Sequence, residues 1–132
     1  VDGISSKNNF NGFNISSGSF IKIENCKIYS NLGSGITLNN VSVANISNNN
    51  IKDCSIYSPG TMSGITISGT SNPNVKISDN FSGNSSKTNQ YQNYGILIAG
   101  GTNLSLTNNT FYNNINGISV TGKPINIGNI VN

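Results

Sequence analysis

Short stretches in which apolar and polar residues alternate recur along the whole chain. Four of them open with glycine and isoleucine: Gly35-Ile36-Thr37-Leu38, Gly64-Ile65-Thr66-Ile67, Gly95-Ile96-Leu97-Ile98 and Gly117-Ile118-Ser119-Val120. A looser copy, Gly12-Phe13-Asn14-Ile15, precedes them. Alternation with a period of two predicts β-strands that bury one face.

A second alternating signature follows each of these stretches and ends in asparagine or aspartate. Its copies are Ile21-Lys22-Ile23-Glu24-Asn25, Ala44-Asn45-Ile46-Ser47-Asn48, Val75-Lys76-Ile77-Ser78-Asp79, Leu104-Ser105-Leu106-Thr107-Asn108 and Ile125-Asn126-Ile127-Gly128-Asn129. Repetition of such units at a spacing of about 20 to 31 residues is typical of a solenoid, in which each repeat buries its apolar face only against its neighbours.

One repeat shows how a turn of the solenoid is built. Gly95 opens a first strand, Leu104-Ser105-Leu106 forms a second, and Phe111 begins a third after the Asn108-Asn109 bend. Each strand would pair with its counterpart one repeat later, which requires a parallel arrangement. The sequence therefore predicts an all-β fold, a right-handed parallel β-helix with about five rungs of three short strands. We expect residues 1–132 to form one domain that is a segment of a larger protein or assembly.

Asparagine is the residue that the repeat uses at its bends. The chain holds 27 asparagines, and the second signature ends at Asn25, Asn48, Asp79, Asn108 and Asn129. Asparagine adopts the left-handed backbone conformation that sharp corners require, and its amide donates and accepts hydrogen bonds as a backbone group does. We expect these five side chains to stack at one bend.

The two cysteines, Cys26 and Cys54, fall at different positions of the repeat. Cys26 follows the bend residue Asn25, whereas Cys54 lies in the column of Asn31 and Asn114. This offset places their Cα atoms beyond the roughly 7 Å that a disulfide spans. We predict two unpaired, buried thiols.

Charge and composition argue against several functions. The net charge of +3 comes from scattered lysines without any arginine, which does not predict a nucleic-acid partner. The chain has neither an apolar stretch of membrane-spanning length nor any histidine, so we expect no membrane partner, no metal site and no cofactor. The only acids are Asp2, Glu24, Asp53 and Asp79, which lie far apart in the repeat. We assign no catalytic residue, because glycoside hydrolysis usually needs two neighbouring carboxylates.

The Gly-Ile-x-Ile opening, the bend after the second signature and the three-strand turn resemble the repeats of the pectate-lyase-like parallel β-helix family. That family includes pectate lyases, polygalacturonases, alginate epimerases and bacteriophage tail spikes. The resemblance runs from about Gly12 to Asn129. It implies the fold, and it implies little about activity because this fold hosts many functions.

Two consecutive repeats are longer than the others, and the extra residues fall mainly at the same corner. They are residues 53–63 and 82–94, which carry Tyr57, Tyr91 and Tyr94 together with Gln92 and Asn93. Tyrosine rings amid amide side chains suit a sugar, which has both C–H faces and hydroxyls. The resemblance implies a polysaccharide groove on this side. We predict these five residues as a substrate-binding surface, and the alternative is that the tyrosines only pack the loops onto the coil.

Three functions remain open from the sequence. The first is a glycan-contacting β-helical module of a phage tail spike or appendage, or of a secreted polysaccharide-associated protein. The second is a fragment of a polysaccharide lyase or glycoside hydrolase whose catalytic residues lie elsewhere, and the third is a structural adhesin or spacer. Because neither end carries a capping element, we expect a homo-oligomer, such as a trimer, or a neighbouring β-helix segment. The resemblance implies an extracellular or virion-surface location and a bacterial surface polysaccharide as partner.

Overall fold

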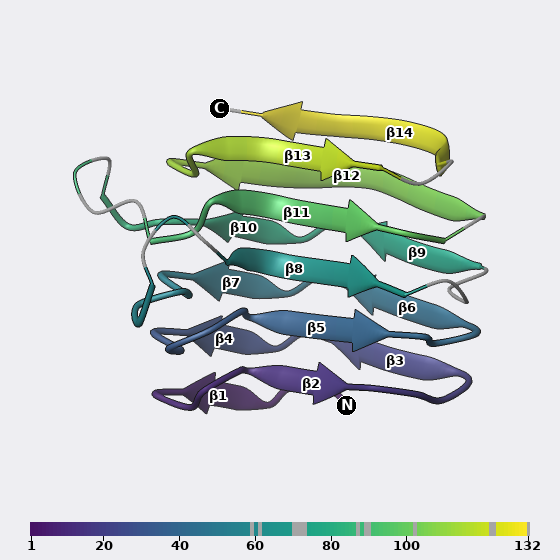
Figure 1. Cartoon of the computed structure of the whole chain (residues 1–132), viewed down its shortest axis with the longest axis horizontal. Coiled ribbons are helices and arrows are strands. Elements are labelled where there is room, and N and C mark those ends of the chain that lie inside the picture. Colours follow the sequence, from purple (N-terminus) through teal and green to yellow (C-terminus); the bar gives the residue numbers. More distant parts are fainter. Residues whose placement is uncertain are drawn as a thin grey trace.

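The strands of this computed structural model run parallel, and each pairs with its counterpart one turn of the chain later (Figure 1). The structure describes residues 1–58, 60, 62–69, 74–86, 88, 91–101 and 103–121, and the backbone of 124–131. The strands of this part are β1 (Ser5–Lys7), β2 (Phe13–Ile15), β3 (Ile21–Glu24), β4 (Lys27–Tyr29), β5 (Ile36–Asn39), β6 (Ala44–Ser47), β7 (Asn50–Lys52), β8 (Ser63–Ser68), β9 (Val75–Ser78), β10 (Phe81–Gly83), β11 (Tyr94–Ala99), β12 (Leu104–Tyr112), β13 (Asn116–Val120) and β14 (Pro124–Val131).

The chain winds into coils with three strand-bearing sides. One side is the sheet β13-β11-β8-β5-β2. The second contains β3, β6 and β9, and the third contains β1, β4, β7 and β10. In the following coil the second and third strands join into one, because β12 pairs with both β9 and β10. The predicted three-strand coil is therefore confirmed for the coils up to β10, whereas in the Gly95 coil the predicted strands at Leu104 and Phe111 are one continuous strand.

The core consists of inward-facing columns that run along the axis. Ile36, Ile65, Ile96 and Ile118 stand in register on consecutive coils, as the Gly-Ile repeat predicts. The first three are completely buried, and Ile118 is partly buried in the last strand of that sheet. Each fully buried isoleucine contributes about 1.5 to 3 kcal/mol relative to an exposed one, so the stacked columns are the main source of stability.

The glycine that opens each repeat faces the third strand across the interior. In four coils a Cβ atom at this position would overlap the side chain opposite; the pairs are Gly12 with Ile28, Gly35 with Ile51, Gly64 with Ser82, and Gly95 with Phe111. The repeated glycine is thus a steric requirement of the narrow interior. It lets the first and third sides of the coil approach each other.

A ladder of buried asparagine amides closes the bend between the second and third sides. Asn49 Oδ1 accepts the backbone N–H of Cys26 at 2.9 Å, and its Nδ2 donates to the carbonyl of Ile23 at 2.9 Å. Asn80 makes the same two bonds to Asn49 N and Ile46 O. Asn109 makes them to Asn80 N and Ile77 O. Each asparagine therefore satisfies the backbone of the coil before it.

The asparagines that form the ladder each lie one residue after the position that the sequence analysis predicts. Asn25, Asn48, Asp79 and Asn108, which we expected to stack, are exposed and have φ between 54° and 59°. They supply the left-handed turn, and the next residue then points inward. The side chain of Asn129 lies outside the described part of the structure. The expected stack is therefore wrong at these four positions, although the conformational role is confirmed.

Replacing the ladder residue Asn80 by alanine should lower the free energy of unfolding by about 2 to 6 kcal/mol. The variant Asn80→Ala leaves the buried N–H of Asn49 and the carbonyl of Ile46 without their partner, at about 1 to 3 kcal/mol each. Urea unfolding measures the change. The control is Asn48→Gly, which keeps the left-handed turn and should change stability by less than about 1 kcal/mol. Equal losses in the two variants would contradict the ladder.

Candidate functional site

The two longest connections between the third and first sides are neighbours at one corner (Figure 1). They are residues 53–62, between β7 and β8, and residues 84–93, between β10 and β11. The N–H of Gly60 donates to the carbonyl of Tyr91 at 2.7 Å, and the N–H of Asn93 donates to the carbonyl of Met62 at 2.7 Å. The two loops therefore support each other through their backbones. We call this corner, with residues 8–12, 30–35 and 113–115 of the other coils, the corner surface.

A carboxylate fixes the start of the second loop. Asp53 Oδ1 accepts the backbone N–H of Ser85 at 2.7 Å, and Asp53 Oδ2 accepts a very short hydrogen bond from the Ser85 hydroxyl. Asp53 itself turns the chain with a φ of 51°. Its carboxylate thus holds the loop of the next coil against its own.

Gln92 is part of the interior and not of the exposed surface. Its side chain has no exposed area, Oε1 accepts the N–H of Cys54 at 3.2 Å, and Nε2 donates to Asn114 Oδ1 at 3.0 Å. The amide bridges the coil below and the coil above, as the ladder asparagines do at the other bend. The structure thus places Gln92, which the sequence analysis predicted as a ligand-contacting residue, in the interior of the coil with no exposed area.

The other predicted residues of the site keep exposed surface to different degrees. Tyr57 is 74% exposed. Tyr91, Asn93 and Tyr94 are half-buried, and Asn93 Oδ1 accepts a hydrogen bond from Asn116 Nδ2 at 2.8 Å. Tyr94 stands in the first strand of its coil, in register with Ser63 and Asn116. The corner brings Tyr57 and Tyr91 into adjoining loops, with Tyr57 as the open ring.

Further exposed apolar residues, which the sequence analysis missed, follow the same corner from coil to coil. Phe10 is 60% exposed, Leu32 39% and Ile115 50%. Backbone hydrogen bonds join the successive turns: Gly33 N to Phe10 O, Tyr57 N to Leu32 O, and Ile115 N to Gln92 O. We call Phe10, Leu32, Tyr57 and Ile115 the apolar row. Their signal in the sequence is an apolar residue placed inside a turn, outside the alternating strands.

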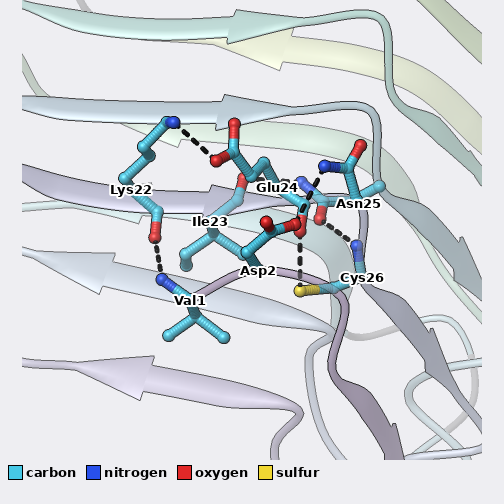
Figure 2. Close-up of polar contacts among 8 residues, drawn as sticks. Val1, Asp2, Lys22, Ile23, Glu24, Asn25 and Cys26 are labelled. Carbon is cyan, nitrogen blue, oxygen red and sulfur yellow. Dashed lines mark hydrogen bonds and ion pairs between the residues drawn. The ribbon is translucent and has the colours of Figure 1, made fainter.

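Two of the four acids, Asp2 and Glu24, lie on adjacent coils, whereas Asp53 and Asp79 lie at separate bends. Figure 2 shows Glu24 in an ion pair with Lys22 at 2.5 Å and Asp2 accepting a hydrogen bond from Asn25 Nδ2 at 2.9 Å. The backbones of Asp2 and Glu24 form an isolated parallel β-bridge between adjacent coils, a proximity that the sequence analysis did not predict. Both carboxylates are engaged by neighbouring side chains, and we assign neither a catalytic role. The pKa of Lys22 is raised, chiefly by its hydrogen bond to Glu24.

The described residues form no pocket, and no three His, Cys, Asp or Glu side chains of this part of the chain come together as a metal site would require. The described residues of the corner surface therefore form an open surface. A ligand there would lie across it instead of entering a cavity.

Both cysteines are buried and free, as predicted. Cys26 occupies the ladder position of its coil, and its Sγ lies 3.1 Å from the carbonyl of Glu24 (Figure 2). Cys54 Sγ lies 3.9 Å from Asn31 Nδ2 at the corner. Burial raises the pKa of the Cys54 thiol to about 11.

Comparison with protein families gives one assignment. The model of the right-handed β-helix region matches residues 2–130, nearly the entire chain. The chain belongs to the right-handed β-helix family. This confirms the fold class and the handedness that the repeat predicts. Comparison with curated proteins and with solved structures gave no significant match.

Membership of the right-handed β-helix family concerns the architecture, and different chemistries are built on this architecture through the loops at its corners. In this β-helix, the described part of the chain has no helix long and apolar enough to cross a membrane. The corner surface is where the coils depart most from the minimal repeat, and we take it as the candidate site.

The structural role of Gln92 is testable by truncation. Gln92→Ala removes the acceptor of the buried Cys54 N–H and should lower the free energy of unfolding by about 1 to 3 kcal/mol. Thermal and urea unfolding measure this. Unchanged stability would show that Gln92 is dispensable to the fold.

The two thiols should be unreactive while the protein is folded. The thiolate is the reactive form, and Cys54 stays protonated well above neutral pH. At pH 8, a colorimetric thiol reagent should react slowly with the native protein and should titrate two thiols after denaturation. Rapid native reaction, or fewer than two thiols on denaturation without reductant, would contradict the buried free state.

Proposed function

We propose that this β-helix is a glycan-contacting module and that it holds a polysaccharide against the corner surface. The observation that supports this most directly is the apolar row. Four exposed apolar side chains stand at one corner of the solenoid, three of them on consecutive coils and Ile115 two coils beyond Tyr57. A linear polymer that lies along the axis would meet one of them after another.

The chemistry of the row suits sugar rings. A sugar ring has apolar C–H faces that pack on tyrosine, phenylalanine or aliphatic side chains, and burial of this area is favourable by about 25 cal/mol per Å². Such a contact is small for a single ring, so useful affinity requires several contacts along the chain. The regular coil-to-coil spacing of about 4.8 Å supplies such a series.

The polar groups beside the row are mostly uncharged. Asn93 is half-buried at the start of β11, and Asn9 and Asn11 lie beside Phe10. The one carboxylate in the long loops, Asp53, is already engaged by Ser85. Amides and hydroxyls match the hydroxyl groups of a neutral sugar, which supports a glycan over a charged partner at this corner.

The module would serve within a larger extracellular or virion-surface assembly, such as a phage tail spike, an appendage or a secreted polysaccharide-associated protein. The proposed partner is a bacterial surface polysaccharide, and the proposed assembly is a homo-oligomer, such as a trimer, or a continuing β-helix. Multiple copies would multiply the weak contacts of one row.

Truncation of the most exposed ring tests the proposal. Tyr57→Ala should weaken binding to isolated bacterial surface polysaccharide about tenfold, because it removes on the order of 60 Å² of apolar contact, or about 1.5 kcal/mol. Affinity electrophoresis through polysaccharide-containing gels measures the change. The melting temperature should stay nearly constant because Tyr57 is 74% exposed.

A matched control is available at another corner. Phe20 is 82% exposed and lies between β2 and β3, away from the apolar row. Phe20→Ala should leave polysaccharide binding unchanged. If both variants bind as the wild type does, or if both lose affinity equally, the corner surface is not the glycan site.

A further inference from the structure

The fold gathers three lysines that are scattered in the sequence onto the third side of the coil. Lys7 lies in β1, Lys27 in β4 and Lys52 in β7, which are successive strands of one sheet (Figure 1). Lys7, Tyr29 and Lys52 stand in register on three consecutive coils. The same side carries Phe81 in β10 and Tyr112 at the end of β12.

Aromatic rings hold two of these ammonium groups in place. Lys7 Nζ lies 5.3 Å from the centroid of the Tyr29 ring, and Lys52 Nζ lies 5.1 Å from that of Phe81. The Phe81 ring in turn lies 6.4 Å from the Tyr112 ring, tilted by 39°. A cation over an aromatic face is attracted to it, so these lysines are ordered before any ligand arrives. We call Lys7, Lys27, Tyr29, Lys52, Phe81 and Tyr112 the lysine–aromatic stripe.

None of the three lysines of the stripe forms an ion pair with an acid of the described residues. Among the described residues, which include all four acids, the one ion pair joins Lys22 to Glu24 on the second side. The carboxylate of Asp2 accepts a hydrogen bond from Asn25, and that of Asp53 accepts one from Ser85. Asp79 lies at the bend before β10. Lys7, Lys27 and Lys52 therefore remain available to an external anion.

We propose that the lysine–aromatic stripe binds the phosphates of a linear polyol or glycan phosphodiester. Lysine acts as a point charge and is a common phosphate ligand. Lys7 and Lys52 are two coils apart, about 10 Å along the axis at the usual strand spacing. A polymer with regularly repeated charges can meet both, with Lys27 on the coil between them.

The occupied ring faces favour a polymer without bases. Single-stranded nucleic acids bind proteins by stacking bases on open aromatic faces. Here ammonium groups cover faces of Tyr29 and Phe81, which leaves Tyr112, 43% exposed, as the one ring of the stripe without a lysine over it. The stripe lies on the strands of the third side that lead into the corner surface, whereas the apolar row lies in the corner loops themselves. Its proposed ligand is charged, so the two surfaces can be tested separately.

Single substitutions with matched controls test the stripe. The probe is a short poly(glycerol phosphate) chain, titrated by calorimetry at several salt concentrations. Lys27→Gln should weaken binding about threefold to fivefold, whereas Lys76→Gln, an exposed lysine in β9 on the second side, should change it by less than about 1.5-fold. With three phosphate contacts, log affinity should fall with log salt at a slope of about 2, by analogy with single-stranded polyanions.

The triple variant Lys7→Gln/Lys27→Gln/Lys52→Gln should lose at least about 20-fold in affinity and most of the salt dependence, with its melting temperature showing that it is folded. Tyr57→Ala should bind this probe as the wild type does, which separates the stripe from the corner surface. Equal losses in Lys27→Gln and Lys76→Gln would overturn the proposal. So would tighter binding of polygalacturonate or of single-stranded DNA of equal charge, which would indicate a carboxylate or a nucleic-acid ligand instead.

Discussion

At one bend of every coil the backbone turns through a left-handed residue, and the polar groups on either side of that residue point into the protein. No water reaches them, so each unpaired group would cost about 1 to 3 kcal/mol. The amides of Asn49, Asn80 and Asn109 bond both the N–H and the carbonyl of the preceding coil. The isoleucine columns and the parallel strands depend on this, because apolar burial leads to a closed coil only if its bends are satisfied.

The alternating pattern predicted the fold because each column repeats the same physical demand. Ile36, Ile65 and Ile96 are interchangeable members of one buried column, so their spacing shows the register. The bend was harder to predict, because two consecutive asparagines, Asn48 and Asn49, do not show which one adopts the left-handed conformation and which one is buried. Asp79-Asn80 contained the answer. A buried carboxylate without a partner is far more costly than a buried amide, so the aspartate has to be the exposed residue.

The candidate site was only partly predictable, because loops do not follow the repeat. The extra length of two consecutive repeats located the corner, and hydrogen bonds join the backbones of the two loops there. Residue type alone did not show that Gln92 is buried in the interior and that Tyr57 is exposed. A polar side chain is buried wherever a neighbouring coil offers matching donors and acceptors, and those partners come from other repeats. The alignment of Lys7 with Lys52 is likewise a property of the register, because neither residue is near the other in sequence.

The ladder also has a direction. Asn49 completes the bend at Cys26, Asn80 completes the bend at Asn49, and Asn109 completes the bend at Asn80. Each of these three bends is thus completed by the coil that follows it in the chain. During synthesis, the newest coil to leave the ribosome keeps unsatisfied backbone groups until the next one has emerged. Growth of the solenoid on the ribosome would therefore proceed one coil behind translation, from the amino-terminal end onward.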